Sequence, residues 1–303
     1  MSVVYDLEHV TTYHYAKPVT FGQHRAIFLP RSSYGGRLLS YALETNLAAE
    51  VRWLMDTVSN NVALIDFQEP GQELKVTYRV RGEHFGYRPA TDFPIDLRAK
   101  ELPIQYTPDE WADLAIFMGP HAQDPDGRLA AWTRAFVLGD RDDTLDVLQR
   151  MMETIHTTLE YQAREAEGTQ LPGETLRLGS GTCRDYAWLM IEALRRLGLA
   201  CRFVSGYLYD PALDGGEVGM IGAGATHAWL QVYLPGAGWR NYDPTNRIVE
   251  GFDLIPVAIA RHPSLVMPLS GSWVGDAGDY LGMEVAVSIR KQGMVPEYGS
   301  DRT

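Results

Sequence analysis

The sequence predicts an α+β fold, in which an N-terminal antiparallel β domain precedes a core of helices and strands. Residues 1–88 consist mainly of short runs of β-branched and aromatic residues, separated by turn sequences. Within residues 109–290, apolar residues recur first at helical spacing and later in strand-like runs. The proline-rich segment 89–108 lies between these two regions. It is therefore expected to connect two domains.

The composition is that of an ordinary globular chain, with 303 residues, 45% of them hydrophobic and 22% charged. A chain of this length can bury a core without disulfides. The net charge of −12 disfavours nucleic acids and anionic membranes as partners. The sequence shows neither a signal-peptide pattern nor an uninterrupted apolar run of about 18 residues. The cytoplasm is the expected location, so no disulfide is expected between Cys183 and Cys201.

The first region reads as a series of strands, which suggests a small antiparallel sandwich or half-barrel. The turn sequences SSYGG, SNN and EPGQ separate several of these runs. The strands are expected at residues 5–19, 24–31, 37–48, 61–68 and 73–85.

The core is expected to begin with helices and to end with strands. The helical patterns cover residues 109–119, 127–139, 142–161 and 183–198. Strands are expected at residues 200–209, 227–235, 239–244 and 283–289. The turn Pro235–Gly238 predicts a hairpin between the second and third of these strands. The last strand is expected to close the core, and residues 291–303 are expected to form a frayed tail.

Cys183 occupies an unusual place, at the point where the glycine-rich stretch GSGT becomes the helix CRDYAWLM. A thiol at a helix start meets unpaired backbone N–H groups and the positive end of the helix dipole, and both favour the thiolate. The sequence therefore makes Cys183 a candidate nucleophile. A small buried residue at the same place is the alternative interpretation.

His227 and Asp243 could complete such a site. A nucleophilic thiol needs a base, and the base needs an acceptor that orients its other nitrogen. The predicted hairpin brings the outer ends of its two strands together, so an imidazole–carboxylate hydrogen bond is feasible. Taken singly, a strand histidine and an aspartate before proline are more often structural. Their order after a cysteine at a helix start favours catalysis.

Two segments carry a resemblance to a known family. Residues 179–210, GSGTCRDYAWLMIEALRRLGLACRFVSGYLYD, and residues 226–246, THAWLQVYLPGAGWRNYDPTN, resemble the transglutaminase-like core. The N-terminal segment YDLEHVTTYHYAKPVTFGQHRAIFLPR resembles the β-rich domain that precedes this core in bacterial members. The segment HPSLVMPLSGSWVGDAGDYLGMEVAVSI is similar to the end of those chains. The resemblance implies a papain-like core fold.

The resemblance also implies roles for individual residues. Cys183 would be the nucleophile, His227 the general base and acid, and Asp243 the orienting carboxylate. The backbone N–H of Cys183 would donate to the oxyanion, and a second donor would come from Tyr161 or Gln162. Two tryptophans of the motif would flank the site, with plain core packing as the alternative: Trp229 and Trp239.

Other features of the sequence receive simpler interpretations. Asp185, in the first turn after Cys183, is expected to complement the helix dipole. Cys201 alternates with Phe203 on a strand and is expected to be buried and inert. The glycine-rich loop DGGEVGMIGAGAT before His227 could either cover the site or simply connect two strands.

No metal or other cofactor is expected. His9 and His14 differ by an odd number of positions, so they face opposite sides of one regular strand, and His24 stands apart from both. The sequence contains no HExxH, CxxC pair, EF-hand or Walker A pattern, and no GxGxxG motif after a strand.

The resemblance implies an enzyme that acts on amide carbonyls through a thioester on Cys183. Hydrolysis of a peptide-type amide is favoured over transamidation, with a protein, a peptide or a small amide as substrate. A non-catalytic interaction module on the same fold is one alternative. A small-molecule acyltransferase is another, although the sequence shows no signature of a coenzyme A site. The oligomeric state is not predicted.

Overall fold

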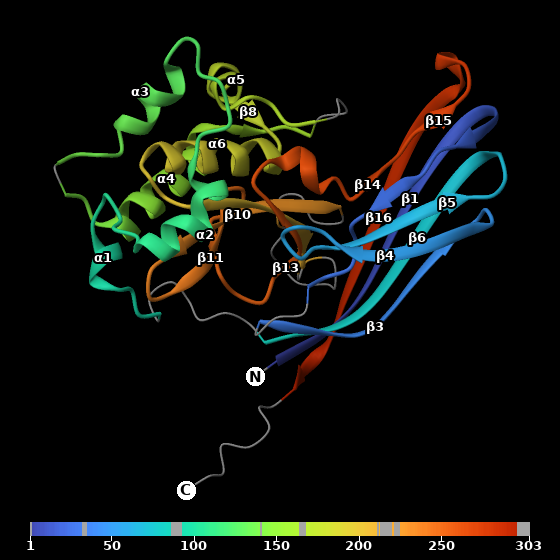
Figure 1. The fold of residues 1–303 in the computed structure, drawn as a ribbon, viewed down its shortest axis with the longest axis horizontal. Helices are drawn as coiled ribbons and strands as arrows, with labels where there is room; N and C mark the ends of the chain where they lie inside the picture. Colours follow the sequence, from blue (N-terminus) through green and yellow to red (C-terminus); the bar gives the residue numbers. More distant parts are fainter. Residues whose placement is uncertain are drawn as a thin grey trace, which may run out of the picture.

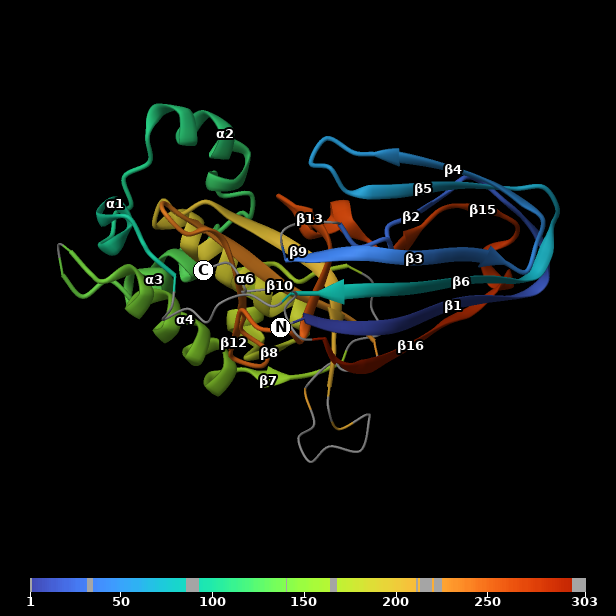
Figure 2. The same cartoon turned by 90° about the horizontal axis from the view of Figure 1, so that it is seen from below.

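The computed structural model describes residues 2–31, 35–85, 93–139, 141–163, 168–210, 212, 220 and 225–295. A long β domain lies beside a core domain whose helices cover a second set of strands (Figure 1). The view from below shows the same division, with the β domain extending away from the helices (Figure 2). This arrangement confirms the predicted α+β class.

The β domain contains two antiparallel sheets. The larger has the order β15 (Trp273–Val274), β1 (Ser2–Phe21), β6 (Gly71–His84) and β3 (Gly36–Thr45), with β16 (Tyr280–Val295) also paired to β1. The smaller has the order β14 (Leu269–Ser270), β2 (His24–Ala26), β5 (Asn61–Phe67) and β4 (Ala49–Met55). Along β6, every second side chain points into the core, as expected for a strand with one buried face. These core residues are Leu74, Val76, Tyr78 and Val80.

The expectation that residues 283–289 close the core is wrong. They belong to β16, which runs antiparallel to β1, with Tyr13 opposite Met283 and Leu7 opposite Ile289. The free edge of β1 presents unpaired backbone groups, and the returning chain satisfies them. The strand also continues through residues 291–295, which were expected to be frayed, and the rest of the predicted tail lies outside the described residues.

The core domain is built on a second five-stranded sheet. Its order is β12 (Ile248–Val249), β11 (Gly238–Asp243), β10 (Thr226–Leu234), β9 (Cys201–Leu208) and β13 (Leu254–Ala260). The predicted hairpin is confirmed, because β10 and β11 are antiparallel and Leu234 stands opposite Gly238. The hairpin places the start of β10 beside the end of β11.

Helix α6 (Cys183–Arg196) is the central helix of the core, and twelve of its fourteen residues are buried. Its far end is held by a buried Glu192–Arg195 ion pair of 3.0 Å. The Arg195 guanidinium also donates to the carbonyl oxygens of Phe117 and Cys201. These contacts fix α6, and with it the position of Cys183.

Shorter elements surround α6. The predicted helix near residues 142–161 is α4 (Thr144–Thr158), and the Asp143 side chain caps its N-terminus. Tyr161 follows it on a two-residue strand, β7 (Glu160–Tyr161), that pairs in parallel with β8 (Ser180–Gly181). The remaining helical segments are α1 (Leu97–Lys100), α2 (Pro108–Met118), α3 (Arg128–Arg134), α5 (Pro172–Leu178), η2 (Pro263–Val266) and η3 (Ala277–Asp279).

Within the described part of the chain, no helix has the length and apolarity needed to cross a membrane. The cytoplasmic location stays a prediction.

Gly206 on β9 tests the packing of the core sheet. A Cβ added there would meet the carbonyl oxygen of Ile255 and would lie 2.6 Å from the Trp229 ring. We expect Gly206→Ala to lower the free energy of unfolding by about 1–3 kcal/mol, as overpacking does. Chemical denaturation measures the change.

Gly119 provides the matched control, because no atom lies within 4 Å of an added Cβ and its φ is −70°. Gly119→Ala should change the free energy of unfolding by no more than about 0.5 kcal/mol. Equal stability of the two variants would contradict the described packing of β9.

Candidate active site

The loop that leads to Cys183 needs glycine at two positions. Gly179 ends α5 with a φ of 67°, a left-handed conformation that side chains disfavour. Gly181 has a different constraint, because an added Cβ would lie 2.9 Å from the Cβ of Asp185. The glycine-rich stretch thus lets the chain turn tightly before α6 begins.

Asp185 fixes the turn immediately before Cys183. Its Oδ2 accepts the backbone N–H of Thr182 at 2.9 Å and the Thr182 hydroxyl at 3.0 Å. Its Oδ1 accepts the backbone N–H of Gln170 at 2.6 Å. The side chain is fully buried. The expected interaction of Asp185 with the helix dipole is therefore only part of its role. Its carboxylate also ties the turn and a neighbouring loop to the start of the helix.

His227 and Asp243 form a buried pair, as the hairpin predicted. Both side chains are fully buried, with 0% of their surface exposed. The Nε2–H of His227 donates to Oδ2 of Asp243 at 2.9 Å. Asp243 also accepts the backbone N–H of Thr245 at 2.9 Å and the side-chain amide of Asn246 at 3.0 Å. The carboxylate is therefore satisfied by three neighbours.

The electrostatics of the pair favour its charged form. Burial alone lowers the pKa of His227, but the Asp243 carboxylate, with a smaller contribution from Cys183, outweighs it and raises that pKa. Burial raises the pKa of Asp243, but His227 outweighs it and lowers that pKa. Among the described residues, Nδ1 of His227 has no hydrogen-bond partner. The ring thus uses Nε2 for Asp243 and leaves Nδ1 available for another group.

Tyr161 lies at the same site. Its backbone pairs with Gly181 through β7 and β8, and its ring packs edge-on against Tyr186 with centroids 6.2 Å apart. Burial, and then the charge of Cys183 and a hydrogen bond to it, raise the pKa of Tyr161 to about 12. The hydroxyl therefore keeps its proton at neutral pH, so it can act as a hydrogen-bond donor beside the thiol.

Gln162, the other candidate donor, has a different position. Its backbone N–H donates to the carbonyl oxygen of Gly181 at 3.0 Å, and the residue is exposed. Of the two candidates named from the sequence, Tyr161 is the better-supported donor, because Cys183, after burial, raises the pKa of its hydroxyl.

The two motif tryptophans separate. Trp229 is fully buried and stacks on His227, with ring centroids 6.0 Å apart. Trp239 stands opposite Tyr233, near the turn of the hairpin, and packs against Phe117 of α2. Of the two open interpretations of Trp239, plain packing fits its position, because it occupies the end of β11 away from Asp243.

The second thiol lies apart from this arrangement. Cys201 is fully buried on β9, as predicted, and burial raises its pKa far above the ordinary value. Both cysteines are free thiols. Cys183 is the one that borders a cavity.

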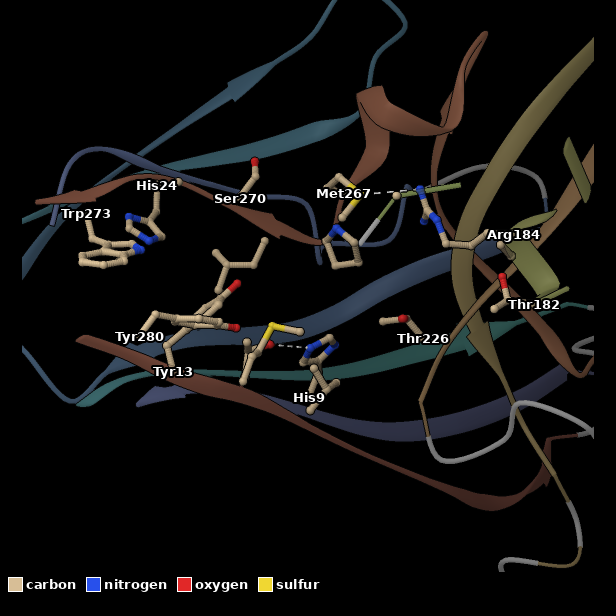
Figure 3. A pocket seen from close by; sticks show the side chains of 18 of the residues that line it. His9, Tyr13, His24, Thr182, Arg184, Thr226, Met267, Ser270, Trp273 and Tyr280 are labelled. Atoms are coloured by element: carbon tan, nitrogen blue, oxygen red, sulfur yellow. Dashed lines mark hydrogen bonds between the residues drawn. The ribbon is translucent and has the colours of Figure 1, made fainter. Parts of the chain in front are cut away.

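A cavity of about 770 Å³ extends from Cys183 and His227 to the β domain. Figure 3 shows Thr182 and Arg184 at one end, Trp273 and Tyr280 at the other, and His9 between them. The Arg184 guanidinium donates to the carbonyl oxygen of Pro263 at 2.8 Å. This wall from the β domain was not predicted, although alternate residues of β1 carried a signal for it: His9, Thr11, Tyr13 and Tyr15.

The three N-terminal histidines have separate partners. His9 is buried, with Nδ1 2.9 Å from the Tyr207 hydroxyl, and burial lowers its pKa to about 4. His14 lies 3.8 Å from Glu73, and His24 contacts the carbonyl oxygen of Gly22 at 2.9 Å. The described residues contain no cluster of three or more His, Cys, Asp or Glu side chains that could hold a metal. Most of the glycine-rich loop before His227 lies outside the described residues.

Comparisons with known proteins match both parts of the chain. Residues 130–244 match the family model described as the transglutaminase-like superfamily. Residues 5–83 match the model described as the bacterial transglutaminase-like N-terminal region. The two matches correspond to the core domain and the β domain.

Relatives and a solved structure extend the likeness. An uncharacterized Mycobacterium leprae protein is 28% identical over 285 residues, covering 92% of this chain and 96% of the relative. The protein-glutamine gamma-glutamyltransferase of Pseudomonas aeruginosa is 33% identical over 69 residues, covering 23% of this chain and 10% of the relative. A Cytophaga hutchinsonii structure, provisionally named a cysteine protease, has a TM-score of 0.72 at 15% identity, covering 99% of this chain and 94% of that one. The last likeness shows the fold.

Asp185→Asn tests the turn before Cys183. An amide nitrogen would face a backbone N–H in place of one carboxylate oxygen, so a buried donor would lose its acceptor. We expect the free energy of unfolding to fall by about 1–3 kcal/mol. Urea denaturation measures this change.

Asp146 offers a matched control, because it holds the same position in the first turn of α4 and is exposed. Asp146→Asn should change stability by no more than about 0.5 kcal/mol. If Asp185→Asn cost no more than this control, the carboxylate would not be what holds the turn.

Proposed function

We propose that the protein is a thiol enzyme that acts on amide carbonyls through Cys183, because residues 130–244 match the transglutaminase-like superfamily. One observation carries the proposal. The buried His227–Asp243 pair leaves Nδ1 of the ring without a hydrogen-bond partner among the described residues, and Cys183, at the start of a helix, lines the same cavity as His227. This arrangement can supply a nucleophile, a proton carrier and an orienting charge.

In the first step, the Cys183 thiolate attacks the carbonyl carbon of the substrate amide. The backbone N–H of Cys183 and the Tyr161 hydroxyl are the proposed donors to the oxyanion. His227 gives its Nδ1 proton to the leaving nitrogen, the C–N bond breaks, and the acyl group remains on sulfur as a thioester. Asp243 holds the ring in place and stabilises its charged form.

In the second step, an acceptor releases the acyl group. His227, now neutral, takes a proton from the acceptor as it attacks the thioester carbonyl, and the S–C bond breaks to regenerate the thiolate–imidazolium pair. We propose water as the acceptor, which makes the enzyme an amidase or peptidase.

Transamidation is the second candidate function. The likeness to a protein-glutamine gamma-glutamyltransferase over 69 residues favours it. The same first step would then deliver the acyl group to a primary amine. Product analysis with and without an added lysine ester separates the two reactions.

The proposal predicts an acyl-enzyme on Cys183. After a reaction with a nitrophenyl ester is quenched in acid, mass spectrometry should find the acyl mass on the peptide that contains Cys183. Cys183→Ala should lose the adduct and at least about 10³-fold in turnover, as loss of a catalytic nucleophile does.

Cys201→Ala is the matched control and should keep both the adduct and the turnover. Turnover by Cys183→Ala at the rate of the unaltered protein would refute the enzyme proposal. Absence of both the adduct and turnover in the unaltered protein would leave a non-catalytic interaction module as the better account.

A further inference from the structure

The cavity beside Cys183 continues along one face of the β domain. Alternate residues of β1 face the cavity, and the antiparallel register gives each a partner on β16. The lining pairs are Tyr15 with Tyr280, Tyr13 with Met283, and Thr11 with Val285. His9, next along β1, contacts Tyr207 of the core. This register aligns a ladder of side chains that starts at the core and extends away from it.

Aromatic rings make the far part of this ladder rigid. Tyr15 packs edge-on against Trp273, with centroids 5.2 Å apart, and lies 6.0 Å from Tyr280. Trp273 comes from β15, which pairs with the end of β1. Figure 3 shows Trp273, Tyr280 and Tyr13 gathered at one end of the cavity. We refer to the following six residues as the aromatic wall: Tyr13, Tyr15, Trp273, Tyr280, Met283 and Val285.

The cavity carries little charge beside this wall. Its described lining contains no aspartate, glutamate or lysine. The Arg184 guanidinium is engaged by the carbonyl oxygen of Pro263 and lies over the ring of Phe203. Burial lowers the pKa of both His9 and His24, so neither ring is charged at neutral pH. A charged group brought beside the wall, at the end of the cavity away from Arg184 (Figure 3), would lose water without gaining an opposite charge.

We propose that the aromatic wall binds the acyl side of the substrate, an extended peptide segment with uncharged aromatic or aliphatic side chains. The inference rests on the proposed function. The acyl group stays bound to Cys183 through both steps, whereas the leaving group and the acceptor must exchange, so a walled cavity suits the retained part. The β1 residues from His9 to Tyr15 span roughly 20 Å at about 3.4 Å per residue. An extended segment of several residues fits along that length.

A set of coumarin amides tests this preference. Acetyl-Ala-Ala-Ala-aminomethylcoumarin is compared with versions that carry Phe, Leu, Glu or Lys at one of the three positions. At the best position, Phe should raise kcat/KM by about tenfold or more over Ala, because burial of an aromatic ring is favourable. Glu and Lys there should lower it by a similar factor.

Variants then locate the preference. Trp273→Ala should bring the Phe/Ala ratio of kcat/KM to within about threefold of one. Tyr280 is 40% exposed, so Tyr280→Ala provides a second variant that folding should tolerate. Trp111→Ala is the matched control, because Trp111 lies on α2 and is 57% exposed. This control should keep the ratio of the unaltered protein.

Binding to Cys183→Ala distinguishes the two proposals. Calorimetry should show tighter binding of the Phe peptide amide than of the Glu peptide amide, and Trp273→Ala in the same background should abolish the difference. If this binding preference is found but the unaltered protein is not acylated, the proposed function is refuted and the assignment of the aromatic wall as a peptide site stands. Acylation that is equally fast with Ala, Phe and Glu, or a ratio unchanged by both wall variants, would overturn the wall and keep the function.

Discussion

The hydrogen bond between His227 and Asp243 is the interaction on which the rest of the site depends. Neither side chain has exposed surface. A buried carboxylate without partners would be strongly destabilising, so the surrounding chain must supply donors. The backbone after β11 turns to offer the Thr245 N–H and the Asn246 amide, and β10 begins where His227 can complete the set. The ring is then oriented with Nδ1 left available, as the proposed role of Cys183 requires.

A second buried network supports the face of the His227 ring. Trp229 stacks on that ring and donates its indole N–H to Asn241 at 2.8 Å. The backbone N–H and the side-chain amide of Asn241 in turn donate to the carboxylate of Glu250. Burial raises the pKa of Glu250 to about 7, although the hydrogen bonds from Asn241 oppose that rise. The hairpin thus holds the ring through both its nitrogen and its face.

The sequence was most informative where structure is local. Cys183 precedes a strongly periodic helix, and a four-residue turn defines the hairpin that joins His227 to Asp243. The failures concern contacts between distant segments. Nothing in residues 283–289 indicates that their partner is β1, and the cavity wall exists only because these strands pair. Strand β13 was missed because its continuous apolar run, LIPVAIA, has no period and contains a proline.

The central claim is that Cys183, His227 and Asp243 act as one unit, and the rate of iodoacetamide labelling against pH tests it most directly. Peptide-resolved labelling should modify Cys183 quickly even at mildly acid pH, because the charged His227 ring favours a thiolate beside it, and should leave Cys201 untouched until denaturation. His227→Ala should slow the acid-side labelling strongly. Asp243→Asn should slow it less than His227→Ala does, because the imidazole is still present. It should slow it nonetheless, because without the Asp243 carboxylate burial lowers the pKa of His227. A Cys183 profile like that of a free thiol, unchanged by His227→Ala, would contradict the account.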